Sequence, residues 1–124
     1  MSARILIVDD EQLVRDLLDR VLRRSGHEVV ATSTADEAIV LLAQSAFDLL
    51  VTDVVMPGMD GFDLLRRVKN AHPDIRVIVL TGHAREQIIS DFLLHGADDY
   101  LAKPFQVHEL IGAVDRVLGA PSKS

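Results

Sequence analysis

The 124-residue chain contains no cysteine. It therefore has no disulfide, no thiolate zinc site and no thiol nucleophile, which is typical of proteins in a reducing compartment such as the cytoplasm. Long hydrophobic runs are missing as well, because no segment approaches the roughly 20 apolar residues of a membrane span. The start, MSARILIVDDE, lacks the apolar length and the cleavage site of a signal peptide. We expect a cytoplasmic protein with no membrane partner.

Positive charge is also scarce. The chain has 13 lysines and arginines against 19 acidic residues, and its formal net charge is −6. This balance argues against direct binding of nucleic acid. Hydrophobic residues make up 48% of the chain, enough for one domain that buries a core without disulfides or a structural metal.

Short β-branched segments alternate with longer segments of helical period. This alternation predicts an α/β fold with a parallel sheet. The expected strands are residues 4–8, 28–31, 48–52, 76–80 and 98–102. The expected helices are residues 11–25, 34–44, a segment from Phe62 that ends before Pro73, and residues 85–95 and 107–118. In the first helix, an apolar stripe that begins at Leu13 is expected to face the core. Residues 1–118 are expected to form one domain, and residues 119–124 a flexible tail or the stub of a linker.

Five polar residues follow the ends of four predicted strands: Asp9 and Asp10, Asp53, Thr81 and Lys103. Strand ends of an open parallel sheet face one crevice, so these side chains are expected to meet. Each also has an ordinary structural explanation: the acids can cap a helix or lie in a turn, the threonine can cap a helix, and the lysine can be solvated. Their joint placement favours a functional site.

The chemistry of such a site follows from its residue types. Carboxylates that crowd together repel one another unless a cation is present, and oxygen-only ligands favour Mg²⁺. A carboxylate can attack phosphorus and form an acyl phosphate, while Lys103 neutralises charge on the phosphoryl oxygens. Thr81 can donate its hydroxyl to the same group, and Gly82 leaves room beside it. The residues predict a phosphorylatable aspartate.

Four separated blocks, ILIVDDE, DLLVTDVVMPGMDG, VIVLTG and DDYLAKPF, occur in this order. With these blocks, residues 3–118 resemble the receiver domain of two-component response regulators, the chemotaxis-regulator-like family. The resemblance implies a flavodoxin-like, doubly wound sheet of five parallel strands in the order 2-1-3-4-5, with five helices. It also implies a phosphorylation-activated signalling switch rather than a conventional enzyme, one that catalyses its own phosphotransfer and slow autodephosphorylation.

The resemblance assigns a role to each acid of the site. It implies that Asp53 is the phosphoacceptor and that Asp10 is a direct Mg²⁺ ligand. Asp9 would assist through water or directly, and the backbone carbonyl of Val55 would complete the protein ligands. Mn²⁺ is expected to substitute for Mg²⁺.

Further assignments concern phosphoryl binding and switching. The resemblance implies that Thr81 and Lys103 bind the phosphoryl group, that Tyr100 is the switch aromatic, and that the Lys103–Pro104 bond is cis. Val55 is two residues after Asp53, and His83 is two residues after Thr81. By the resemblance, both would border the path of the water that hydrolyses the acyl phosphate, and would tune the lifetime of the phosphorylated state.

The expected partners follow from the same resemblance. A histidine kinase or a histidine phosphotransfer protein would supply the phosphoryl group. The surface of the fourth helix, fifth strand and fifth helix, including Ile88, Phe92, Tyr100 and Val107, would bind a downstream effector protein or domain, or form a phosphorylation-dependent homodimer.

Three other functions compete with this one. An aspartyl phosphohydrolase needs a second aspartate two residues after the nucleophile, where this chain has Val55. A flavodoxin-like cofactor carrier needs a phosphate loop after the first strand, where Asp9, Asp10 and Glu11 would repel a flavin phosphate. The remaining alternative is a receiver-like docking module that works without phosphorylation.

Overall fold

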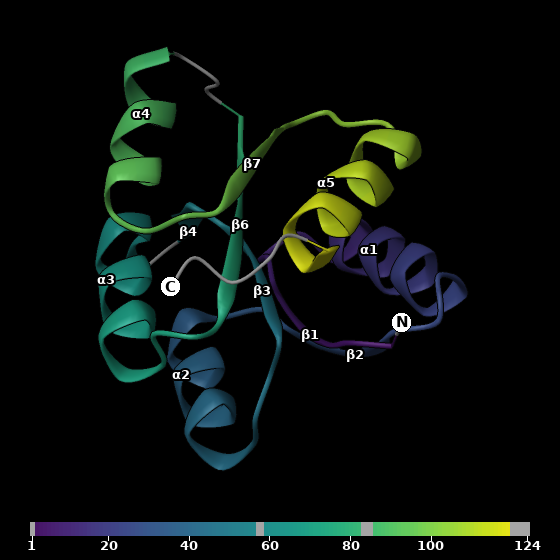
Figure 1. The fold of residues 1–124 in the computed structure, drawn as a ribbon, viewed down its shortest axis with the longest axis horizontal. Helices are drawn as coiled ribbons and strands as arrows, with labels where there is room; N and C mark the ends of the chain where they lie inside the picture. Colours follow the sequence, from purple (N-terminus) through teal and green to yellow (C-terminus); the bar gives the residue numbers. More distant parts are fainter. Residues whose placement is uncertain (1, 57–58, 83–85, 120–124) are drawn as a thin grey trace.

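The structure is a computed structural model that describes residues 2–56, 59–82 and 86–119. Its main sheet has five parallel strands in the order β2-β1-β3-β6-β7 (Figure 1). These are β1 (Arg4–Val8), β2 (Glu28–Thr32), β3 (Leu49–Asp53), β6 (Arg76–Thr81) and β7 (Asp99–Ala102). Numbered as predicted, they give the order 2-1-3-4-5, so the predicted fold class is confirmed.

Helices cover both faces of this sheet. In Figure 1, α1 (Gln12–Arg24) and α5 (Val107–Gly119) lie on one side, and α2 (Ala35–Gln44), α3 (Gly61–Ala71) and α4 (Glu86–Leu94) lie on the other. Each face has its own buried cluster. The side of α1 and α5 includes Ile5, Ile7, Val51, Leu80 and Leu110, and the opposite side includes Leu6, Val8, Leu50, Leu64 and Val79. Successive side chains of a strand point to opposite faces of the sheet, so the strands contribute residues to both clusters. This explains why β1 is apolar almost throughout.

Helix boundaries follow local signals. The Thr34 side chain accepts a hydrogen bond of 3.2 Å from the Glu37 N–H and caps α2, as the Thr34–Glu37 spacing predicts. Gly26 and Gly96 follow α1 and α4 with φ angles of 93° and 106°, a left-handed conformation that glycine adopts without strain. Among the helices of the described residues, none is long and apolar enough to cross a membrane.

Every predicted boundary lies within one residue of the boundary in the structure, and one pair of short strands was not predicted. A small antiparallel hairpin of β4 (Val55–Met56) and β5 (Met59–Asp60) precedes α3 and was not predicted. Strands of two residues are too short to show an alternating pattern. Helix α5 runs through Gly119, one residue into the predicted tail, and residues 120–124 lie outside the described residues.

The prediction that Leu13 faces the core is wrong, because its side chain is 83% exposed. The buried residues of α1 are Leu18, Val21 and Leu22. Leu13 lies about 140° around the helix from Leu18, so it points away from that stripe. It stands instead as an apolar residue on the surface at the start of α1.

The prediction that Phe92 contributes to a partner surface is also wrong. Its side chain is 3% exposed and stacks on Phe62, with the ring centroids 4.2 Å apart. Phe92 therefore anchors α4 against α3, and the exposed apolar residues of α4 are Leu93 and Leu94.

Candidate functional site

The register of the sheet brings the acids of β1 and β3 together. Val8 pairs with Thr52, so the residues that follow them, Asp9 and Asp53, are neighbours at the carboxyl edge. The Asp9 N–H donates a 3.2 Å hydrogen bond to the Thr32 carbonyl, which extends the pairing of β1 with β2 by one residue. The strand order therefore brings Asp9 and Asp53 together at the ends of two adjacent strands, as predicted.

The register of β6 and β7 places the other two predicted residues at the same edge. Thr81 pairs with Ala102, and the Lys103 N–H donates to the Thr81 carbonyl at 2.8 Å. Thr81 is buried, with 1% of its surface exposed. The Lys103–Pro104 peptide bond is cis.

The Lys103 ammonium joins the two halves of the site. Its Nζ lies 2.8 Å from Asp9 Oδ2 and 3.0 Å from Asp53 Oδ2. It also lies 3.3 Å from Glu11 Oε1. Glu11 was not among the site residues predicted from the sequence. One sequence feature could have indicated Glu11, because it is the third of three consecutive acids after β1. The same position also starts a helix, where acids are common, so this feature did not stand out.

Burial shapes the electrostatics of this cluster. Asp9 is fully buried, and burial raises the pKa of its carboxyl, while the hydrogen bonds from Lys103 and from the Glu11 N–H oppose that rise. Burial lowers the pKa of Lys103, but hydrogen bonds to Asp9 and Asp53 and the charges of both carboxylates raise it above its ordinary value. Lys103 therefore remains charged and is held by the acids around it.

The acids also fit a metal ion. Carboxylate oxygens of Asp9, Asp10, Glu11 and Asp53 all lie within 4.8 Å of one another. Asp9 and Asp53 are buried, whereas Asp10 and Glu11 are exposed. An oxygen-only donor set of this charge suits a hard divalent cation, which would relieve the repulsion that one lysine leaves.

The turn after β3 orients the predicted phosphoacceptor. Asp53 Oδ1 accepts a 3.1 Å hydrogen bond from the Val55 N–H, so each of its two oxygens has a donor. The Val55 side chain points outward and is 65% exposed. Gly82 is exposed, and a Cβ added to it would meet nothing within 4 Å, so there is room beside Thr81. His83 lies outside the described residues.

Tyr100 lies on the same face of the sheet as Thr81. Its register partner on β6 is Val79, and Thr81 follows Val79 by two residues, so alternation directs both toward the α4 side. Tyr100 is half-buried and packs against the core cluster of that side, as does Ile88 of α4. The predicted switch aromatic and Ile88 of α4 thus pack against the same core cluster.

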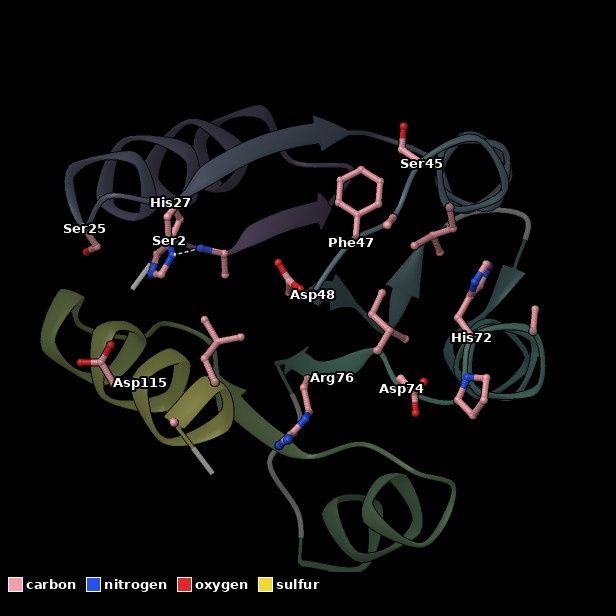
Figure 2. Close-up of a pocket in the computed structure, with 18 residues that line it drawn as sticks. Ser2, Ser25, His27, Ser45, Phe47, Asp48, His72, Asp74, Arg76 and Asp115 are labelled. Carbon is pink, nitrogen blue, oxygen red and sulfur yellow. Dashed lines mark hydrogen bonds between the residues drawn. The ribbon is translucent and has the colours of Figure 1, made fainter. Parts of the chain in front are cut away.

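A concavity of about 850 Å³ opens at the opposite edge of the sheet. Figure 2 shows Asp48, Arg76 and Asp115 around it, near the amino ends of the strands. On the same lining, the Ala3 N–H donates a 3.0 Å hydrogen bond to His27 Nδ1. The residues that line it do not include Lys103 or the four acids around it, which are Asp9, Asp10, Glu11 and Asp53. The acidic cluster at the carboxyl edge is therefore a separate site.

Comparison with known sequences gives one family. The sequence pattern of the response regulator receiver domain matches residues 5–115. The chain is 38% identical over 116 residues to response regulator protein FleR of Pseudomonas aeruginosa, covering 94% of this chain and 24% of that protein. It is 41% identical over 122 residues to DNA-binding transcriptional regulator NtrC of Rhizobium meliloti, covering 98% of this chain and 25% of that protein. The chain thus spans about a quarter of the length of these relatives.

Solved structures give the same fold. Chemotaxis response regulator CheY4 of Vibrio cholerae superposes with a TM-score of 0.89 at 28% identity, covering 95% of this chain and 100% of that chain. NtrX of Brucella abortus superposes with a TM-score of 0.91 at 35% identity, covering 96% of this chain and 28% of that chain. These likenesses extend over nearly the whole sheet and its helices.

Proposed function

Since this chain belongs to the response regulator receiver domain family, we propose that it is a two-component signalling switch that accepts a phosphoryl group on Asp53. The observation that supports this most is the Lys103 ammonium, which contacts Asp53 and Asp9 at the carboxyl edge of the sheet. A cation fixed beside a carboxylate within an oxygen-rich cluster is what stabilises charge on a transferring phosphoryl group.

The cluster fits Mg²⁺, and Mn²⁺ would substitute. Asp10, Asp53 and the Val55 carbonyl would hold the ion, with Asp9 directly or through water. When bound, the ion would neutralise charge on the phosphoryl oxygens. The donor set supports this assignment because every side chain in it is a carboxylate.

The proposed step is an in-line transfer. An Asp53 carboxylate oxygen forms a bond to phosphorus while the bond from phosphorus to the donor histidine nitrogen breaks. That nitrogen keeps the electron pair and takes a proton. Lys103 neutralises the added charge, and the Thr81 hydroxyl donates to a phosphoryl oxygen. Slow hydrolysis of the resulting acyl phosphate would return the switch to its resting state.

The surface around the site supports a protein phosphodonor. Two apolar residues close in sequence to the acids of the site are exposed: Leu13 is 83% and Val55 65% exposed. A docking protein that covers such residues gains free energy, because their apolar surface is removed from water. We propose that a cytoplasmic histidine kinase or histidine phosphotransfer protein docks here.

Asp53→Asn tests the phosphoacceptor. We expect acetyl phosphate with Mg²⁺ to add one phosphoryl group to the parent protein, and none to Asp53→Asn or to the parent with a chelator, because the amide is a poor nucleophile and the acids repel the donor. Intact-mass spectrometry measures this. Circular dichroism must show that the variant is folded. No addition to the folded parent under any condition would favour the phosphorylation-independent docking module.

The proposed switch couples Thr81 to Tyr100. A phosphoryl oxygen would draw the Thr81 hydroxyl toward it, and the half-buried Tyr100 on the same face would turn into the vacated space. This would change the surface formed by α4, β7 and α5, where an effector protein or domain, or a second copy of the chain, would bind.

Tyr100→Ala should uncouple this surface from phosphorylation. We expect amide NMR signals of Leu94 and Val107 to move on phosphorylation in the parent and in Tyr100→Phe, which keeps the ring, and to move much less in Tyr100→Ala. All three proteins should still take up the phosphoryl group. The same shifts in Tyr100→Ala as in the parent would contradict the switch.

A further inference from the structure

The Lys103 ammonium has as many carboxylate partners as it has N–H donors. An ammonium group offers three donors. Lys103 Nζ lies 2.8 Å from Asp9, 3.0 Å from Asp53 and 3.3 Å from Glu11. A phosphoryl oxygen that takes a hydrogen bond from Lys103 must therefore replace one of these three partners.

The three partners differ in how easily they can leave. The Asp9 side chain is fully buried, and its other oxygen accepts a 2.9 Å hydrogen bond from the Glu11 N–H. Asp53, with a side chain 7% exposed, is itself the proposed nucleophile. The Glu11 side chain is 63% exposed and makes the longest contact. Its carboxylate returns to water at little cost, whereas releasing Asp9 would leave a buried charge without its cation.

We propose that the Glu11 carboxylate accepts the Lys103 hydrogen bond that a phosphoryl oxygen accepts once Asp53 is phosphorylated. In the resting state it occupies the third N–H of the ammonium, and it gives way when a phosphoryl group reaches Asp53. Glu11 is thus a positioning residue that acts through Lys103 and sets how readily this lysine meets the incoming group. This inference rests on the proposed function, because it needs phosphorylation at Asp53.

Two variants distinguish competition for the Lys103 N–H from a general effect of the negative charge of Glu11. Glu11→Ala removes both the carboxylate and its charge. Glu11→Asp keeps the charge but is one methylene shorter, so we expect it to lose the 3.3 Å contact with Lys103. Both variants keep the backbone N–H that fixes Asp9, and aspartate is a good N-cap for α1. Glu37→Asp is the matched control, since Glu37 is exposed in the first turn of α2 and, among the described residues, its side chain makes no hydrogen bond or ion pair.

We expect Glu11→Asp and Glu11→Ala to take up the phosphoryl group from acetyl phosphate about two- to fivefold faster than the parent at saturating Mg²⁺, the range of one exposed ion pair. Intact mass against time gives the rates. Glu37→Asp should match the parent. Parental rates in Glu11→Asp would overturn the inference, whether or not Glu11→Ala is faster, because charge alone would then account for any effect.

NMR of the Lys103 side-chain ammonium gives a readout besides the rate. In the metal-free protein, we expect the Nζ signal to differ between the parent and both Glu11 variants and to be unchanged in Glu37→Asp. An unchanged signal in Glu11→Asp would overturn the inference. If the folded parent takes up no phosphoryl group, the proposed function and this inference fail together. If the parent is phosphorylated and Glu11→Asp behaves like it, only the inference fails.

Discussion

Replacing Lys103 by methionine is expected to lower the free energy of unfolding of the metal-free protein by about 3 kcal/mol, as when one partner of a buried ion pair is removed. Lys103 Nζ is the cation that contacts both Asp9 and Asp53, whose side chains are 0% and 7% exposed. Without it, two buried carboxylates face each other. Urea unfolding followed by circular dichroism measures the loss, since the chain has no tryptophan.

Mg²⁺ should restore much of this stability, because a divalent cation can replace the lost ammonium charge among the same oxygens. Lys69→Met is the matched control. Lys69 is also largely buried and donates to the Ile75 carbonyl at 2.7 Å and to Asp98 at 3.2 Å, but it is not part of the acidic cluster. Mg²⁺ should not restore the stability that the Lys69→Met variant loses. An equal response of both variants, or none in Lys103→Met, would contradict the electrostatic account of the site.

Gly61→Ala is expected to cost about 2 kcal/mol of stability, in the range of overpacking. A Cβ on Gly61 would lie 2.7 Å from both the Cβ and the carbonyl oxygen of Val54 and 2.8 Å from its Cα. This is backbone that cannot simply rotate away, so α3 or the end of β3 must move. Because Val54 follows Asp53, we also expect phosphorylation by acetyl phosphate to slow by about tenfold, since small displacements of reacting groups are costly.

Gly112→Ala provides the comparison for this effect. It is also a helical glycine, but its added Cβ would meet only the end of the flexible Arg116 side chain, at 3.3 Å. Alanine favours a helix over glycine by roughly 0.5–1 kcal/mol, so we expect Gly112→Ala to be neutral or stabilising, with a parental rate of phosphorylation. Thermal unfolding measures the stability, and intact mass against time measures the rate of phosphorylation. A Gly61→Ala protein as stable and as fast as the parent would show that the close approach to Val54 has no functional role.

The fold and the main site residues were predictable because they depend on periodicity and strand order. Alternating strand and helix patterns indicate a parallel sheet, and such a sheet has one carboxyl edge. Asp9, Asp53, Thr81 and Lys103 each follow or end a strand, so their meeting follows from topology without knowledge of any side-chain contact. The register of the strands then determines which of them are neighbours.

The remaining features depend on tertiary contacts that periodicity does not carry. Phe92 belongs to an apolar stripe of α4, but its burial depends on tertiary packing in the core cluster and on Phe62, which the stripe does not specify. Glu11 begins a helix, where an acid needs no special explanation, and its contact with Lys103 joins residues 92 positions apart in the sequence. The hairpin of β4 and β5 is too short for any pattern.

The most direct test of the central claim is to locate the phosphoryl group. The protein is treated with acetyl phosphate and Mg²⁺, reduced with borohydride, which converts an aspartyl phosphate into homoserine, and analysed by peptide mass spectrometry. We predict homoserine at position 53 and at no other aspartate, and none when Mg²⁺ is chelated. Homoserine at Asp9 or Asp10, or an unmodified Asp53 in protein that has gained a phosphoryl group, would contradict the assignment of Asp53 as the phosphoacceptor.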